Sequence, residues 1–316
     1  MLTQETTVTK SFTVSSTLLQ YINRYYYKVI GVCFLILYLL NFFIKVIPMD
    51  YTGFILLFSF LSFTVVSDLQ RDIRIKSFII IAIPYLLMVF IGLASGNDLW
   101  HKLLVWEMDR NVVFNLNSAF SKIPFNDSSF ARIFSPSWLT WYMKMVYNTG
   151  FVLAVIVPLI RSALCIDFKK MLKYTLSAHI FQVIIITPFY MLFRLQEVWV
   201  VNGHPDMLGR NLTGPALLET TLNCMPSMHT SIAFAMFLLV LREKNKIFKW
   251  VWGFYCLSVI YSTMYLEIHW AIDVIGGLIL GYITVKLVDF VLAKSYAKFT
   301  KGFKSVFYKQ NSSSMQ

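Results

Sequence analysis

Residues 270–293 read WAIDVIGGLILGYITVKLVDFVLA, and only Asp273, Lys286 and Asp289 interrupt this apolar run with charge. A helix of roughly 20 apolar residues can cross the hydrocarbon core of a bilayer. Further apolar runs lie upstream, and together they predict an all-α fold, a polytopic transmembrane bundle of about eight spanning helices. The upstream runs lie near 28–47, 52–67, 77–94, 143–164, 173–193, 228–241 and 250–266.

The composition supports the same fold class. The chain has 316 residues, of which 57% are hydrophobic and 14% charged, and its mean hydropathy is +0.63. A soluble domain of this length could not cover so much apolar surface with so few charges. The strands of a membrane barrel alternate polar and apolar residues over about 10 positions, and this sequence lacks that alternation. The composition therefore favours an integral, multi-pass membrane protein.

The basic residues predict the orientation of the bundle. With the N-terminus inside, most of the 28 Lys and Arg residues fall in the inside loops and in the tail after residue 293. This distribution agrees with the positive-inside rule, so both termini are expected in the cytoplasm. The net charge of +12 then reflects topology, and nucleic acid is not an expected partner. The basic tail is expected to lie against anionic headgroups of the bilayer.

The apolar runs divide the chain into five expected parts. Polar residues precede the first run, which argues against a cleaved signal peptide, because such a peptide has its apolar core close to the terminus. The sequence does not determine the oligomeric state. We expect residues 1–27 to form a cytoplasmic segment, 28–94 the N-terminal transmembrane helices, 95–142 an extracytoplasmic or interfacial segment, 143–293 the core and 294–316 a basic cytoplasmic tail.

Small residues and sequons have mostly structural interpretations. Gly277 and Gly281 are spaced as in a helix-packing face. The cysteines form no C-x-x-C pair or disulfide framework. Sequons begin at Asn126 and Asn211 in the two long outer segments, although such tripeptides are common by chance. We expect Cys33, Cys165 and Cys256 to be small buried residues and Cys224 to be structural.

Ionisable residues at membrane depth concentrate in two places. His229 stands where an outer loop enters the sixth predicted helix, and His269 stands where the seventh turns into the eighth. Two crossings of about 20 residues each separate the two histidines, so both should lie on the extracytoplasmic or lumenal face. Asp273 follows His269 by four positions, about 6 Å along one helix face. Such residues are functional candidates because burying them in a membrane is costly.

This arrangement suits phosphoryl transfer by nucleophilic catalysis. A neutral nitrogen of His269 would attack phosphorus while Asp273 fixes the imidazole tautomer. His229 would protonate the departing alkoxide and then activate water or an acceptor hydroxyl. Pro226 could start the sixth helix, whose first amides would face the phosphate, and Ser227 could add a hydroxyl donor.

The pattern P-S-x-H at 226–229, followed by S-x(6)-H-x(3)-D at 262–273, resembles two signatures of the type 2 phosphatidic acid phosphatase superfamily. It looks closest to the branch that contains inositol phosphorylceramide synthases, with Thr263 and Met228 at positions where Arg and Gly are usual. Asp109-Arg110 and the residues after them are also similar to that branch. The resemblance covers about 105–285.

The resemblance implies a six-helix phosphatase-type catalytic core within 143–293, preceded by N-terminal helices. It implies that His269 is the nucleophile, His229 the acid–base and Asp273 the orienting carboxylate, acting on a phospholipid or lipid phosphate without a metal or other cofactor. No segment of this sequence matches the superfamily's first motif, K-x(6)-R-P, which supplies phosphate-binding cations. Arg194 and Arg210 are the predicted substitutes for its phosphate-binding cations.

Several alternatives remain open on the sequence. Water as acceptor would make the chain a lipid phosphatase, and a lipid hydroxyl would make it a transferase, such as one that moves phosphoinositol to ceramide. A zinc-dependent membrane hydrolase would use His229, His269 and Asp273, with His204 as a further ligand. A transporter would use the same ionisable residues as a proton relay. His179 is expected to be hydrogen-bonded within the bundle, and His101 is expected to be a surface residue.

Overall fold

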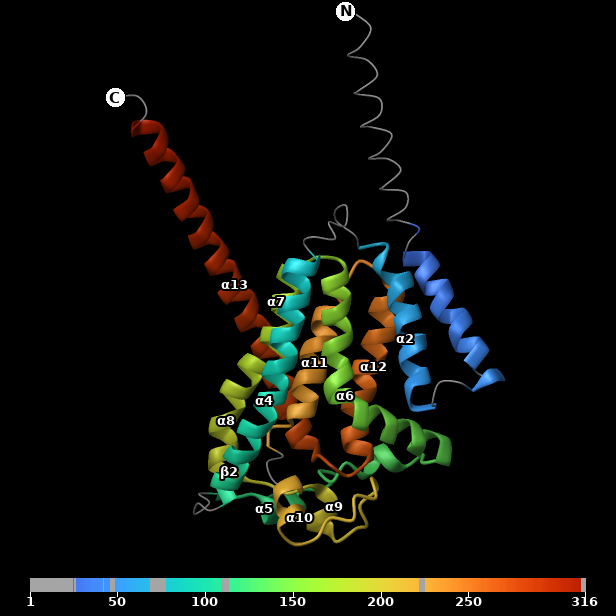
Figure 1. Cartoon of the computed structure of the whole chain (residues 1–316). Helices are drawn as coiled ribbons and strands as arrows, with labels where there is room; N and C mark the ends of the chain where they lie inside the picture. The colour runs from blue at the N-terminus through green and yellow to red at the C-terminus, as the bar shows by residue number, and fades with distance from the viewer. Residues whose placement is uncertain are drawn as a thin grey trace, which may run out of the picture. The chain divides into compact units, whose positions relative to one another are not determined.

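The computed structural model describes residues 25–313 except 26, 42, 46–48, 69–77, 109–113 and 222–224, and these parts are mostly helical (Figure 1). Each predicted apolar run is helical over most of its described length, which confirms a predominantly helical fold. Among the described residues the only strands are β1 (Phe114–Asn115) and β2 (Phe193–Arg194), which pair in parallel. The helical elements are one over Tyr27–Asn41, α2 Met49–Val65, η1 Phe78–Ala82, α4 Ile83–Met108, α5 Asn117–Ser121, η2 Ser129–Arg132, α6 Ser137–Leu164, α7 Phe168–Thr175, η3 Leu176–Ile180, α8 Phe181–Leu192, α9 Val198–Asn202, α10 Gly214–Thr221, α11 Met228–Val240, α12 Lys246–Tyr265 and α13 Ala271–Ser313.

Three helices in the described part of the chain are long and apolar enough to cross a membrane. They are Ser137–Leu164, Phe168–Leu192 and Ala271–Ser295. Four more apolar helices are shorter than the roughly 20 residues that a crossing needs. A count of about eight crossings and a cytoplasmic position for both termini therefore stay predictions. The shorter helices are Tyr27–Asn41, Thr52–Val65, Ile79–Gly92 and Met228–Val240.

Contacts divide the chain into two compact units. Unit 1 comprises Met1–Ala94, Ile156–Met171 and Arg242–Val251, and unit 2 comprises Ser95–Val155, Leu172–Leu241 and Trp252–Gln316. Unit 2 contains every residue that the sequence predicts to act in the site. Its last helix, α13, passes the predicted boundary at residue 294 and continues to Ser313. The reason is local, since the tail has no proline and contains five lysines, which favour helix.

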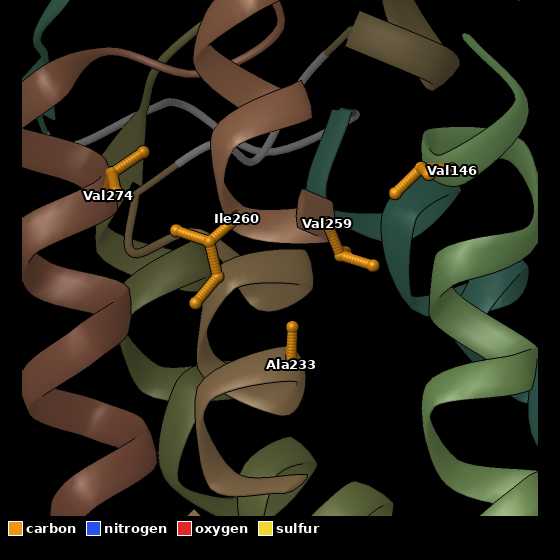
Figure 2. Close-up of a cluster of buried hydrophobic side chains, with 5 residues drawn as sticks. All are labelled: Val146, Ala233, Val259, Ile260 and Val274. Atoms are coloured by element: carbon orange, nitrogen blue, oxygen red, sulfur yellow. The ribbon is translucent and has the colours of Figure 1, made fainter. Parts of the chain in front are cut away.

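A buried apolar cluster joins four helices of unit 2 (Figure 2). Its side chains come from α6, α11, α12 and α13. Val274 directly follows Asp273 on α13, and Ala233 lies one turn after His229 on α11. The packing that removes this apolar surface from water therefore also sets the relative position of the two helices that carry these ionisable residues. The cluster consists of Val146, Ala233, Val259, Ile260 and Val274.

Two glycines allow α13 to lie directly against α11. A Cβ atom on Gly277 would stand 2.7 Å from the carbonyl oxygen of Ser227, and one on Gly281 would stand 2.6 Å from that of Ser231. These are clashes with backbone, which no side-chain rotation can relieve. The prediction that Gly277-x(3)-Gly281 forms a helix-packing face is confirmed.

Gly277→Ala and Gly281→Ala are each expected to destabilise the protein by about 1–3 kcal/mol, because the added methyl group overpacks a backbone contact. The thermal unfolding midpoint of the purified protein in detergent measures this effect. Gly253→Ala on α12 is the matched control, since a Cβ there meets only the ring of Phe237 at 3.5 Å. Equal midpoints for Gly281→Ala and Gly253→Ala would contradict the close approach of the two helices.

Loops at one end of unit 2 cap the start of α13, near α5, α9 and α10 (Figure 1). The backbone oxygen of Asn126 accepts from Ala271 N at 2.8 Å, and its Oδ1 accepts from Ile272 N at 2.9 Å. The Nδ2 of Asn126 donates to the carbonyl oxygen of Phe120, and the residue is 2% exposed. The sequon at Asn126 is therefore inaccessible in the folded chain, whereas Asn211 is exposed.

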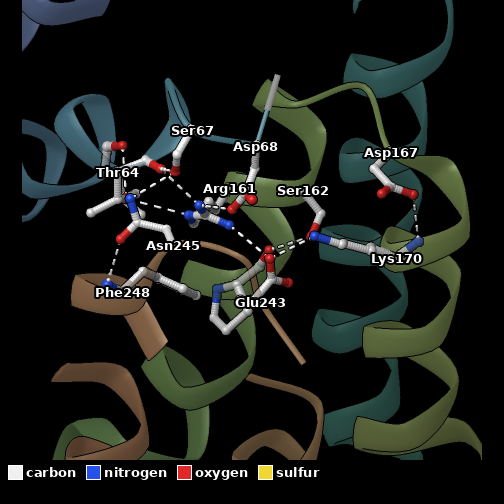
Figure 3. Close-up of polar contacts among 12 residues, drawn as sticks. Thr64, Ser67, Asp68, Arg161, Ser162, Asp167, Lys170, Glu243, Asn245 and Phe248 are labelled. Carbon is white, nitrogen blue, oxygen red and sulfur yellow. Dashed lines mark hydrogen bonds and ion pairs between the residues drawn. The ribbon is translucent and has the colours of Figure 1, made fainter. Parts of the chain in front are cut away.

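A buried ion-pair network lies in unit 1 (Figure 3). Arg161 of α6 is 1% exposed and donates to Glu243 at 2.9 Å and to the carbonyl oxygen of Thr64 at 2.7 Å. It also pairs with Asp68, and Lys170 donates to Glu243 at 2.6 Å. The orientation argument counted Arg161 and Lys170 as loop charges. The protein itself neutralises them.

The described cysteines differ in exposure. Cys165 and Cys256 are buried as predicted, but Cys33 is exposed. The prediction for Cys33 is wrong because its side chain lies on the face of the Tyr27–Asn41 helix that also exposes Val32 and Leu35. Burial raises the pKa of the Cys165 thiol to about 12, so this thiol stays protonated. Cys224 lies outside the described residues.

Candidate active site

His269 and Asp273 form a buried pair at the start of α13. The Nδ1–H of His269 donates to Oδ2 of Asp273 at 2.6 Å, as the i, i+4 spacing requires. His269 is 4% exposed and Asp273 is 0% exposed. The other ring nitrogen, Nε2, is buried and has no hydrogen-bond partner among the described residues. A carboxylate that fixes Nδ1 as the protonated nitrogen leaves Nε2 with a free lone pair.

A tight turn between α12 and α13 places His269. The backbone N–H groups of Ile268 and His269 both donate to the carbonyl oxygen of Thr263. The hydroxyl of Thr263 donates to the carbonyl oxygen of Ile260 at 2.7 Å. Thr263 occupies the position where the superfamily that the sequence resembles usually has Arg. In this structure Thr263 is fully buried and accepts the hydrogen bonds that shape the turn.

His229 lies in the first turn of α11, facing His269. The ring centroids of the two histidines are 5.9 Å apart with an interplanar angle of 54°. Ser227 caps this helix, since its Oγ accepts from Thr230 N at 3.2 Å and donates to Thr230 Oγ1 at 2.9 Å. The helix thus begins after Ser227 rather than at Pro226, and the Ser227 hydroxyl is engaged in the cap. Its predicted role as a phosphate donor stays a prediction that these bonds do not favour.

Two aromatic rings of α6 contact His229. Tyr147 stacks on the imidazole with centroids 4.8 Å apart and an interplanar angle of 24°. Phe151 meets the same imidazole at 5.0 Å and 60°. These residues were missed in the sequence, although their i, i+4 spacing on an apolar run could have marked them as one face of a helix.

Arg210 lies close enough to His229 to interact with it electrostatically, but two carboxylates hold its guanidinium. Its Nε donates to Asp206 at 2.8 Å, and its Nη2 donates to Glu197 at 2.5 Å. Burial of Arg210 would lower its pKa, but the bonds to Glu197 and Asp206 outweigh this and raise it. Burial likewise would raise the pKa of Asp206, and the hydrogen bonds from Arg210 hold it below the usual value. In this structure Arg210 mainly orders its own loop.

Arg194 and Lys144 differ from Arg210 because no carboxylate among the described residues pairs with them. Arg194 ends β2, directly after α8, and is half-buried. Lys144 is half-buried on α6, one turn before Tyr147. Neither side chain has an ion pair with any residue that the structure describes. Lys144 lies seven residues before Phe151, which is the spacing of Lys and Arg in the K-x(6)-R-P motif, but Phe151 and Val152 stand where that motif has Arg and Pro.

Glu267 links three segments of unit 2. Its carboxylate pairs with Arg132 Nε at 3.0 Å and with His204 Nδ1 at 2.7 Å. Its backbone lies in the left-handed region with φ +59°. Trp199 N donates to its carbonyl oxygen. Glu267 therefore braces the turn that precedes His269. No three His, Cys, Asp or Glu side chains in the described parts converge as metal ligands.

Some sequence predictions cannot be placed. Asp109, Arg110 and Cys224 lie outside the described residues. His179 lies in η3, with its ring 5.4 Å from that of Phe151.

Comparison with known proteins bears on the segment that holds the site. The sequence profile of the PAP2 superfamily matches residues 189–294, which include His229, His269 and Asp273. Among solved structures, the chain aligns with the crystal structure of Aquifex aeolicus LpxE, with a TM-score of 0.42 and 16% identity over 53% of this chain and 96% of that chain. No curated protein matches the chain. The profile supports the resemblance to the superfamily over residues 189–294, and the branch stays a prediction.

Proposed function

We propose that the chain is a membrane-embedded lipid phosphatase or phosphotransferase in which His269 carries the phosphoryl group and His229 moves protons. One observation carries the proposal. The buried Nε2 of His269 has no partner among the described residues, Asp273 fixes the opposite nitrogen, and a second imidazole lies 5.9 Å away, centroid to centroid. An unpaired buried nitrogen is costly, and a substrate phosphorus atom would give it a bonding partner.

The reaction has two half-reactions. Nε2 of His269 attacks phosphorus, the bond from phosphorus to the lipid oxygen breaks, and protonated His229 gives its proton to the departing oxygen. Water or a lipid hydroxyl then attacks the phosphohistidine, His229 takes the proton, and the P–N bond breaks. Asp273 offsets the positive charge that His269 gains in the first step, as the carboxylate of a catalytic triad does for its histidine.

Lys144 and Arg194 are the cations that we assign to the substrate phosphate. Both are half-buried and lack ion pairs among the described residues, so their charge is available to a ligand. Arg210 is a weaker candidate than the sequence alone suggested, since Glu197 and Asp206 already occupy its guanidinium. A phosphate would have to compete with both carboxylates for it.

Lys144→Met and Arg194→Met are each expected to lower kcat/KM for a lipid phosphate about 10- to 100-fold, which corresponds to the roughly 1.5–3 kcal/mol of a hydrogen bond to a charged group. The loss should appear mainly in KM, because these cations would bind the phosphate in the ground state as well. Lys122→Met is the control, since Lys122 is exposed on the outer segment after α5. Unchanged kinetics in both variants would remove these two residues from the phosphate site.

A labelling experiment tests the proposed function itself. Purified protein is mixed with phosphatidate labelled at the phosphate, quenched within one turnover, and digested to find an alkali-stable phosphopeptide that contains His269. Release of inorganic phosphate identifies a phosphatase. A phospholipid labelled at its phosphodiester, with added ceramide or diacylglycerol, tests transfer of the headgroup to a lipid hydroxyl, the activity that the inositol phosphorylceramide synthase branch suggests. Absence of a phosphopeptide together with turnover would exclude the covalent route.

The alternative functions are outcomes of the same assay. Loss of turnover in a zinc chelator and its return with added zinc would favour the zinc-dependent hydrolase. A protein with no turnover on any lipid phosphate, but with proton-coupled uptake in vesicles, would favour the transporter. Neither alternative has an observation of its own in its favour. The Nδ1 of His204, the further ligand of the zinc proposal, is bound to Glu267.

A further inference from the structure

The two histidines of the site are held in different ways. His269 is fixed by a hydrogen bond to Asp273. His229 has no hydrogen bond at either ring nitrogen with any residue that the structure describes. Its imidazole instead contacts Tyr147 and Phe151, which lie one turn apart on α6. A histidine that transfers protons needs a fixed ring plane, because proton transfer requires hydrogen-bond geometry.

We infer that Tyr147 and Phe151 are positioning residues for His229, a role that rests on the proposed function of that histidine. The nearly parallel Tyr147 ring limits tilting of the imidazole, and Phe151 meets it at a steep angle and limits its rotation. Phe151 is itself backed by His179, whose ring stands nearly perpendicular to it at 80°. His179 sits in the π-helical turn η3, which interrupts the helix from α7 to α8.

Among the described residues, neither nitrogen of His229 has a hydrogen-bond partner, so both can bond substrate or water. A hydrogen-bonded partner would occupy one nitrogen and fix the tautomer, as Asp273 does for His269. An acid–base histidine gives up a proton in one step and takes one in the next. Ring nitrogens that have no hydrogen bond to the protein are available for both proton transfers. Both positioning residues lie on α6, before the segment that the PAP2 profile matches.

Kinetics with two leaving groups test the inference. Tyr147→Leu and Phe151→Leu should lower kcat for an alkyl phosphate about 10- to 100-fold, since misplacement by about 1 Å can cost this much. KM should change little. With a nitrophenyl phosphate, whose leaving group needs no proton, the rate of phosphoenzyme formation should fall less than about threefold. Tyr147→Phe keeps the ring and should stay within about threefold of the parent on both substrates.

Two controls separate positioning from folding. Tyr142→Leu removes a half-buried tyrosine of the same helix that bonds Ser258 and not His229. Any loss of rate in Tyr142→Leu should be the same for the alkyl phosphate and for the nitrophenyl phosphate. In a His229→Ala background, Tyr147→Leu should add no further loss, because the two changes act on one function. Equal losses with both leaving groups, or additive losses with His229→Ala, would overturn the inference.

A chemical readout keeps the inference apart from the proposed function. Carbethoxylation by diethyl pyrocarbonate, followed by peptide mass spectrometry, reports how well each imidazole is shielded. His229 should react about fivefold or more faster in Tyr147→Leu than in the parent, as expected when a stacked ring is removed. The half-exposed His204 serves as the internal standard. An unchanged rate at His229 would overturn the positioning role even in an active protein. A faster rate in a protein with no phosphate turnover would instead reject only the proposed function.

Discussion

His269→Ala is expected to reduce phosphate transfer from any lipid substrate by roughly 10³-fold or more, the scale of losing a catalytic nucleophile. No other ring nitrogen in the described chain combines burial, the absence of a partner and a carboxylate on the opposite side. The labelled phosphopeptide should disappear together with turnover. His229→Ala should also abolish turnover of alkyl esters, since their leaving oxygen must be protonated.

Asp273→Asn separates charge from shape at the same site. The amide keeps the size of the carboxylate but loses its negative charge and allows the wrong imidazole tautomer, so a loss of about 10²- to 10⁴-fold is expected. Asp289→Asn is the matched control on the same helix, because Asp289 forms a partly exposed pair with Lys173 at 2.6 Å. That variant should retain activity. Near-normal turnover in His269→Ala would show that the nucleophile is another group.

Arg161→Met should be the most destabilising single change in unit 1, at about 3–5 kcal/mol. Arg161 holds Asp68 and Glu243, which are 1% and 3% exposed at the side chain, and its guanidinium lies 4.4 Å from the Phe248 ring. Removing the cation leaves the two buried carboxylates without their guanidinium partner. The unfolding midpoint of purified protein in detergent, at constant protein and detergent concentration, measures the loss.

Two further variants test the cause of that loss. Lys173→Met breaks a pair whose side chains are 23% and 30% exposed, so it should cost no more than about 1 kcal/mol. Adding Asp68→Asn and Glu243→Gln to Arg161→Met should restore much of the stability, since neutral groups need no buried counter-charge. If the triple variant were as unstable as Arg161→Met, lost packing rather than unpaired charge would be responsible.

The charge count shows what sequence reasoning leaves out. It counted Arg161 and Lys170 as free loop charges, yet both are paired with Glu243 inside the fold. An exposed cation and a cation that is paired within the fold look the same in a charge count. The partners come from residues far apart in sequence, such as Asp68 and Glu243, so only the packed structure shows the neutralisation. The burial of Asn126 is another such feature, because its side-chain oxygen caps α13 in the folded chain and the sequon alone does not show this.

The choice of phosphate-binding cations shows a second limit of prediction from sequence. Arg194 and Arg210 were chosen for charge and loop position, which treats them as equivalent. Three-dimensional contacts separate them, since Asp206 and Glu197 hold Arg210 and no described residue pairs with Arg194. The sequence did not single out Lys144, and only the contact of Tyr147 with His229 shows that this face of α6 reaches the site.

The sequence by itself determined the helical fold, the His269–Asp273 pair and the glycine face of α13, because each follows from periodicity within one helix, where spacing fixes geometry. Only the tertiary structure shows that aromatic rings contact His229, which cations have no ion pair among the described residues, and what Glu267 binds. Those features depend on contacts between helices far apart along the chain. Side-chain packing sets such contacts, and no local spacing encodes them.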